Sequence, residues 1–163
     1  MAKTPVTPAR SATRSARQTP KAKKRVTPKP NGSTTHKVRN GMARNLGVRL
    51  VSVTRQRVVA EMPVTRKHLN RTGIVNGGAL MAFADVVGAT GTVANLPPGH
   101  RTTTLESKTN FFAAGLGPVM HAVSKPLHIG RTTMVWQTSI RNPDKKLVAV
   151  VTQTQMVLPA QRT

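Results

Sequence analysis

The chain has 163 residues, and 26 Lys and Arg against four Asp and Glu give it a formal charge of +22. A length near 150 favours one domain of ordinary size with an appended segment. The absence of Cys excludes disulfide frameworks, thiolate metal sites and Cys nucleophiles, and four carboxylates are too few for a Ca²⁺ or Mg²⁺ cage. Three Phe, one Trp and no Tyr argue against an aromatic base-stacking platform.

Residues 1–40 carry 11 of the basic residues and no acidic one, and five prolines interrupt them. Such a segment buries too little apolar surface to offset its ordering entropy, so we expect a disordered basic tail. A secretory signal is not indicated, because no apolar stretch follows the charges. An organelle transit peptide stays open, although the proline spacing opposes the amphipathic helix that such peptides form. A solvated polycation can also contact nucleic acid without sequence specificity.

Residues 41–163 carry the pattern of a folded domain. Six short runs rich in Val, Thr and Ile, bounded by Gly, Pro or Asn, predict β-strands; they are 48–53, 57–62, 102–112, 119–126, 131–141 and 147–158. The first two are separated by three residues and predict a hairpin. Residues 142–145 (Asn-Pro-Asp-Lys) have the composition of a type I turn and predict a second, antiparallel hairpin.

Residues 77–94 differ from the strands because they are apolar nearly all round and end before Pro97 and Pro98. This stretch is too short for a membrane span, carries Asp85 at its middle and contains four Gly, so it predicts a buried helix rather than a transmembrane one. An antiparallel sheet wrapped around one long central helix is an α+β fold.

Asp85 has only small or apolar neighbours one helical turn away, so a partner for its carboxylate must come from elsewhere. It can be a structural group bonded to a strand or to a second subunit, or it can be a general base or nucleophile. The turn before the helix favours the second interpretation. Gly77 and Gly78 leave the first N–H groups of the helix open to a thioester or ester carbonyl, whose developing oxyanion they would stabilise.

These motifs resemble a family over residues 45–158. The chain is similar there to hotdog-fold acyl-coenzyme A thioesterases of the phenylacetate-degradation (PaaI) type, in the 4-hydroxybenzoyl-CoA thioesterase superfamily. The resemblance is carried by Asn70-x-x-Gly73-x-x-Asn76-Gly77-Gly78 with Ala84-Asp85, by 102–112 (Thr-Thr-Thr-Leu-Glu-Ser-Lys-Thr-Asn-Phe-Phe) and by 128–134 (His-Ile-Gly-Arg-Thr-Thr-Met).

The resemblance implies hydrolysis of an acyl-CoA thioester to free acid and CoA, with no cofactor and no metal. It implies that Gly77 polarises the carbonyl, Asp85 acts as base or nucleophile, Asn70 positions the water and Thr104 assists beside the carboxylate. The residues that it places on coenzyme A are Gly78, Ala113, Ala114, His128, Gly130, Arg131 and Thr132. We expect Phe83, Val87, Phe111 and Phe112 to line the acyl pocket.

The resemblance further implies a homodimer or homotetramer in which the Gly-Gly turn of one subunit faces Asp85 of the other. Many relatives have His where this chain has Asn76, and we expect Asn76 to hold the turn by a side-chain hydrogen bond. Two alternatives stay open: a non-catalytic acyl-CoA binding module, which Asn76 leaves possible, and a nucleic-acid-associated protein acting through its basic tail. We expect a cytoplasmic location.

Overall fold

The computed structural model describes Met1, His36–Lys37 and residues 41–160. Almost all of the predicted basic tail lies outside the described residues, so the prediction of disorder stays a prediction there. The exception is His36–Lys37, which form β1 and pair antiparallel with β2 (Arg49–Thr54). Backbone pairing with a sheet edge requires no apolar side chains, so these two residues can join the sheet although the segment has no apolar pattern.

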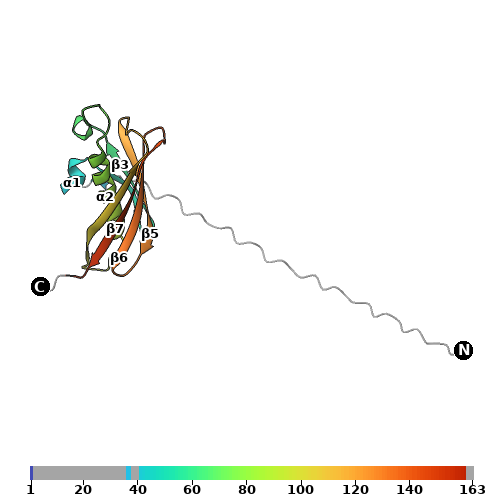
Figure 1. Cartoon of the computed structure of the whole chain (residues 1–163). Coiled ribbons are helices and arrows are strands. Elements are labelled where there is room, and N and C mark those ends of the chain that lie inside the picture. Colours follow the sequence, from blue (N-terminus) through green and yellow to red (C-terminus); the bar gives the residue numbers. More distant parts are fainter. Residues whose placement is uncertain (2–35, 38–40, 161–163) are drawn as a thin grey trace. The chain divides into compact units, whose positions relative to one another are not determined.

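The domain is built on one antiparallel sheet in the order β1-β2-β3-β5-β6-β7-β4 (Figure 1). The remaining strands are β3 (Arg57–Pro63), β4 (Arg101–Phe111), β5 (Val119–Ile129), β6 (Thr133–Arg141) and β7 (Leu147–Leu158). All six predicted strands are confirmed, and their ends shift by three residues or fewer. Both predicted hairpins are confirmed, and the second turn is closed by a 3.0 Å bond from the Lys145 N–H to the Asn142 carbonyl.

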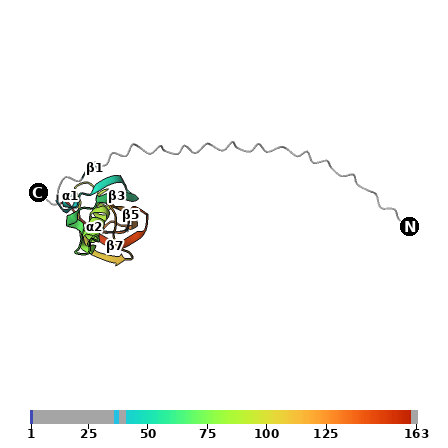
Figure 2. The same ribbon diagram turned by 90° about the horizontal axis from the view of Figure 1, so that it is seen from above.

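The predicted central helix is α2 (Gly77–Val93), and Figure 2 shows it inside the curve of the sheet. Its sheet-facing side chains, including Leu80 and Phe83, are buried because the sheet closes over them. Contact is tightest at Gly91, where a Cβ atom would lie 2.6 Å from the Trp136 ring on β6. The α+β hotdog arrangement predicted from the sequence is therefore confirmed.

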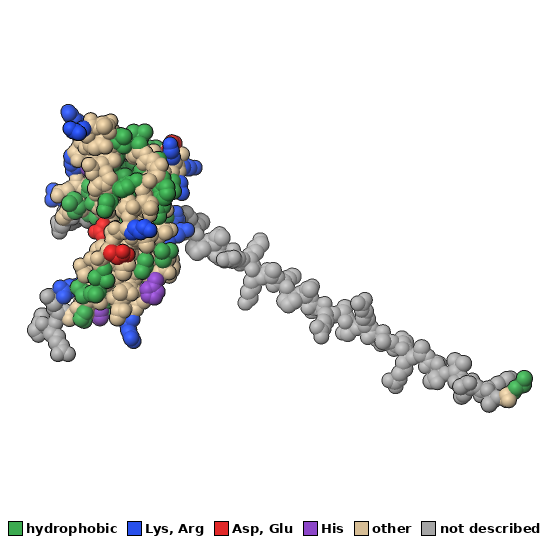
Figure 3. All heavy atoms as spheres, viewed as in Figure 1, with side chains coloured by type: hydrophobic (Ala, Val, Ile, Leu, Met, Phe, Trp, Pro, Cys, Tyr) green, Lys and Arg blue, Asp and Glu red, His purple; other side chains and the backbone are tan. Residues whose placement is uncertain are grey.

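One side of α2 is not covered by the sheet. Met81 and Val93 are 39% and 59% exposed, and Leu105 on β4 is 52% exposed. β4 is also an edge strand of the described sheet, since β7 is its one partner among the described strands. Figure 3 shows hydrophobic side chains on this face of the molecule with acidic side chains among them. The uncovered side of α2, called here the apolar stripe of α2, and the edge strand β4 thus both expose apolar side chains.

Two short helices complete the described residues. α1 (Gly41–Asn45) precedes β2, and the 3₁₀ helix η1 (Arg66–His68) opens the loop that leads to α2. None of the described helices has the length and apolar character needed to cross a bilayer.

Candidate active site

The loop before α2 is organised by Asn70. Its side-chain oxygen accepts hydrogen bonds from the Thr72 N–H (2.9 Å), the Thr72 hydroxyl (2.8 Å) and the Ile74 N–H (3.1 Å). An Asn that accepts from its own loop in this way fixes the path of the backbone. The two amide hydrogens of Asn70 have no partner within the described part of the chain, so they are the atoms through which Asn70 could hold a water.

Asn76 is the N-cap of α2. Its side-chain oxygen accepts from the Gly78 N–H at 2.8 Å, and its backbone is extended. This is the hydrogen bond expected for a residue that holds the turn, and it occupies the N–H of Gly78. The N–H of Gly77 has no partner among the described residues. One N–H of the Gly-Gly pair is thus capped and the other is open.

Phe111, at the end of β4, lies against Gly77. A Cβ atom at Gly77 would be 3.1 Å from the tip of the Phe111 ring, although the ring is 51% exposed. Phe112 is 61% exposed beside it, so both aromatic rings are available to a ligand. The expectation that Phe83 and Val87 line the pocket is wrong, because both are fully buried between α2 and the sheet.

Asp85 lies on α2 at the border between its covered and uncovered sides and is partly buried. Its Oδ1 accepts from the Thr104 hydroxyl at 2.8 Å and from the Gln153 amide at 3.3 Å. The structure thus places Thr104 against the carboxylate and adds a donor that the sequence analysis missed. No described residue donates to Oδ2, and this oxygen is left for a ligand or a water.

The residues expected to contact coenzyme A fall into two groups at opposite ends of the sheet. Ala113 and Ala114 follow the end of β4, whereas the turn at 130–132 lies beside the start of that strand, since the Val157 N–H donates to the Thr132 carbonyl and Val157 pairs with Thr102. Nine residues of strand separate the two ends by about 30 Å. One chain alone does not bring both groups to one site.

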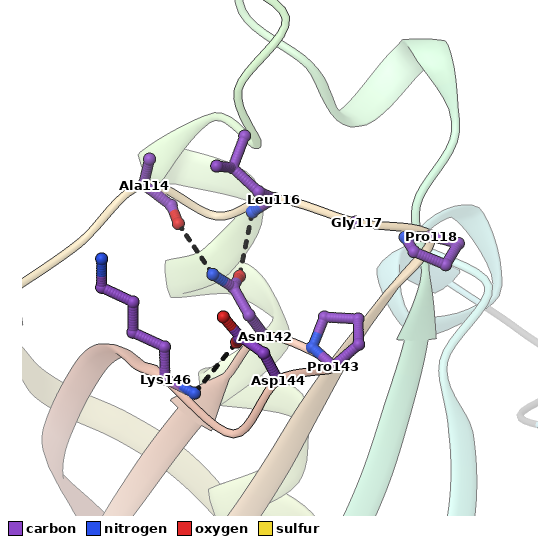
Figure 4. Close-up of a pocket in the computed structure, with 8 residues that line it drawn as sticks. All are labelled: Ala114, Leu116, Gly117, Pro118, Asn142, Pro143, Asp144 and Lys146. Carbon is purple, nitrogen blue, oxygen red and sulfur yellow. Dashed lines mark hydrogen bonds between the residues drawn. The ribbon is translucent and has the colours of Figure 1, made fainter.

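The loop of Ala113 and Ala114 is held by Asn142, which is 5% exposed. Asn142 donates to the Ala114 carbonyl (3.1 Å) and accepts from the Leu116 N–H (2.9 Å). Figure 4 shows these bonds at the edge of a hollow of about 410 Å³ between the loop and the β6–β7 turn. The hollow is lined by Ala114, Leu116, Gly117, Pro118, Asn142, Pro143, Asp144 and Lys146.

At the other end, His128, Arg131 and Thr132 are exposed. The His128 ring lies against Gly130 and takes up the space that a Cβ atom would need there. An exposed guanidinium on a tight turn is free to contact phosphate oxygens. No group of three metal-ligating side chains occurs in the described ranges.

His68 is buried beside the loop that leads to α2, and its pKa leads to a prediction about stability. It is 3% exposed, its Nδ1 accepts from the Thr65 N–H at 3.1 Å, and burial and the nearby Lys67 charge lower its pKa below 6.5. The unfolded chain therefore protonates first as the pH falls, so stability is complete above pH 6.5 and declines below it. We expect the free energy of unfolding, measured by urea titration, to fall below pH 6.5 by up to about 1.4 kcal/mol per pH unit.

The His68→Gln variant, which keeps an acceptor for the Thr65 N–H, should lose this slope. His128→Gln, at an exposed site, should keep it. An unchanged slope in His68→Gln would contradict the assignment.

The comparisons with known proteins agree on one family. The model of the thioesterase superfamily matches residues 72–149. The putative esterase ComA2 of Bacillus subtilis is 32% identical over 108 residues, which cover 64% of this chain and 84% of that protein. The 1,4-dihydroxy-2-naphthoyl-CoA hydrolase of Listeria monocytogenes is 26% identical over 110 residues, covering 68% and 89%.

Solved structures lead to the same family. A thioesterase from Haemophilus influenzae is 25% identical with a TM-score of 0.72, covering 76% of this chain and 86% of that one. A hypothetical thioesterase from Streptococcus pneumoniae, solved with coenzyme A, is 26% identical with a TM-score of 0.64, covering 71% and 88%. The chain belongs to the thioesterase superfamily, has its hotdog fold, and is a hydrolase of thioester bonds.

Proposed function

We propose that the protein hydrolyses acyl-coenzyme A thioesters, with Asp85 as the general base and the Gly77 N–H as the oxyanion donor. The observation that carries the proposal is the state of Asp85, whose Oδ1 holds two donors while Oδ2 has none among the described residues. The CoA substrate is supported by the name of the Listeria relative and by the coenzyme A in the Streptococcus structure.

In the proposed reaction, Asp85 Oδ2 takes a proton from a water, and the water oxygen attacks the thioester carbon. The carbonyl electrons move to the oxygen, which the Gly77 N–H and the positive end of α2 stabilise. Collapse of this intermediate breaks the C–S bond, and the proton held by Asp85 passes to the leaving sulfur. The products are a free acid and CoA.

The two groups cannot act together within one chain. Gly77 and Asp85 are eight residues apart on α2, which is about 12 Å along the helix axis, whereas reacting atoms must approach to about 3–3.5 Å. A second copy, packed on the apolar stripe of α2 and the free edge of β4, would bring its Asp85 to this chain's Gly77. The same packing would join the two groups of coenzyme-contacting residues into one site. We therefore propose a homodimer as the smallest active unit, with a tetramer compatible.

Asn76 has a geometric role in this proposal. Asn76→Ala removes the cap on the Gly78 N–H and should cost about 1 kcal/mol of stability and loosen the oxyanion turn, with a several-fold loss of kcat. Asn76→His, which can also accept from that N–H, should leave kcat within about threefold of wild type. Steady-state kinetics and thermal melting of both variants check this. A tenfold gain in kcat from Asn76→His, about 1.4 kcal/mol of barrier, would show instead that the residue tunes carbonyl polarisation.

A panel of aryl, short-chain and medium-chain CoA thioesters, read by release of free thiol, tests the proposed activity. Turnover of at least one supports it. Binding of CoA thioesters with no turnover of any would contradict the proposed substrate class and leave CoA thioesters as bound ligands only. The PaaI subtype and the cytoplasmic location stay predictions. Nucleic-acid contact by residues 1–40 also stays a prediction, which deletion of that segment tests by loss of retention on DNA with thioesterase activity preserved.

A further inference from the structure

Two buried glutamines stand on the helix-facing side of β7. Gln153 and Gln155 are both fully buried, and they occupy alternate positions of a strand whose other inward residues are apolar. Burying an amide costs free energy unless its hydrogen bonds are made, so both side chains require a reason to be there. The Gln153 nitrogen bonds to Asp85 and the Gln155 nitrogen to Thr104 beside it, whereas the Gln153 oxygen has no partner among the described residues.

Gln155 fixes the direction of the Thr104 hydroxyl. The Thr102 hydroxyl lies within donating distance of the Met156 carbonyl (2.9 Å) and of the Gln155 oxygen (3.0 Å), and on the other side of the amide the Gln155 nitrogen donates to the Thr104 oxygen at 2.8 Å. An amide nitrogen can only donate, and Thr104 has one hydroxyl hydrogen. That hydrogen is therefore directed to Asp85 Oδ1, at 2.8 Å.

Gln153 holds the same carboxylate from the other side. Its amide nitrogen donates at 3.3 Å both to Asp85 Oδ1 and to the backbone carbonyl of Asp85. The amide fits there because residue 88 has no side chain: a Cβ atom at Gly88 would lie 2.6 Å from the Gln153 amide carbon. Gly88 is one turn after Asp85, so the helix itself provides the space for the donor that orients its carboxylate.

We infer that Gln153 and Gln155 are positioning residues of the thioesterase site. Together with Thr104 they occupy Asp85 Oδ1 with two fixed donors and leave Oδ2 as the oxygen that takes the proton of water. Neither glutamine touches the substrate, and both act through Asp85. The inference rests on the proposed role of Asp85 and adds the groups that select which carboxylate oxygen reacts.

Gln153→Met and Gln155→Met test the inference, because Met keeps the length of the side chain and removes its donors. We expect kcat on a CoA thioester to fall about 10- to 100-fold with KM within about twofold, since the base is misplaced while substrate contacts remain. Gln137→Met, on the exposed side of β6, is the matched control and should leave kcat unchanged. Wild-type kcat in both variants at β7 would overturn the inference.

A second pair of variants separates positioning from packing. Gln153→Ala should lower both the melting temperature and kcat, because it leaves a cavity and removes the donor. Adding Gly88→Ala refills part of that cavity with a methyl group, so the melting temperature should recover while kcat stays low. Recovery of kcat together with stability would mean that Gln153 only fills space, and it would overturn the inference.

The Asp85→Asn background distinguishes this inference from the proposed function. If Asp85→Asn lowers kcat to a residual but measurable rate, Gln153→Met in that background should lower this rate no further, as expected for a residue that acts through Asp85. If Asp85→Asn is inactive and both Met variants are fully active, only the positioning inference fails. If Asp85→Asn is fully active, the proposed role of Asp85 fails and the inference fails with it.

Discussion

Replacement of Asp85 by Asn is expected to lower kcat by about 10²- to 10⁴-fold, the contribution of a positioned general base. The Asn oxygen can still accept from Thr104 and Gln153, so it should take the place of Oδ1. The Asn nitrogen then stands where Oδ2 was and cannot accept a proton. Steady-state kinetics with a CoA thioester measure the loss, and KM and the melting temperature should change little.

Asp144→Asn is the control for the loss of one negative charge. Asp144 lies on the exposed β6–β7 turn, where its side-chain oxygen accepts from the Lys146 N–H at 3.1 Å, and an Asn can make the same bond. This variant should keep wild-type kcat. An Asp85→Asn protein with wild-type turnover would remove Asp85 from the mechanism.

The second large effect concerns the subunits. Gly77→Val should abolish activity, because the added side chain meets the Phe111 ring and covers the open N–H. If Gly77 of one subunit acts with Asp85 of the other, a mixed dimer of Gly77→Val and Asp85→Asn chains contains one intact site and one doubly damaged site. Unfolding and refolding the two inactive proteins together at equal amounts should therefore restore about a quarter of wild-type specific activity.

Each variant refolded alone serves as the control and should stay inactive. Size-exclusion chromatography of the mixture should show a dimer or a larger assembly. Mixtures in which mixed dimers form without any activity would mean that Gly77 and Asp85 of the same chain serve one site, and this result would refute the shared site.

Much of this architecture could be predicted from local sequence, and the reasons are physical. The strands alternate Val, Thr and Ile with polar residues, and Met134, Trp136, Thr138 and Ile140 share one face in the sequence and are all buried in the structure. Local hydrogen bonds could be predicted as well, since Asn76 caps a helix that begins at the next residue.

What could not be predicted depends on strands that are distant in sequence. Gln153 reaches Asp85 across 68 positions, and nothing local to β7 distinguishes an inward glutamine from an outward one. The only feature of the sequence that could have indicated this contact was an amide side chain at an inward position of an alternating strand. Phe83 and Val87 were misassigned for the related reason that an all-apolar helix does not show which side the sheet covers. The pairing of His36–Lys37 with β2 could not be predicted either, because these two residues show no apolar pattern in the sequence.

The close contact between Trp136 and Gly91 also gives the protein an internal optical label. Trp136 is the single tryptophan, there is no tyrosine, and its indole is fully buried where the helix meets the sheet. Light emitted after excitation of indole therefore comes from one interior position and from no other part of the chain. A red shift of that emission would report separation of α2 from β6, so every variant discussed above can be followed without an added dye.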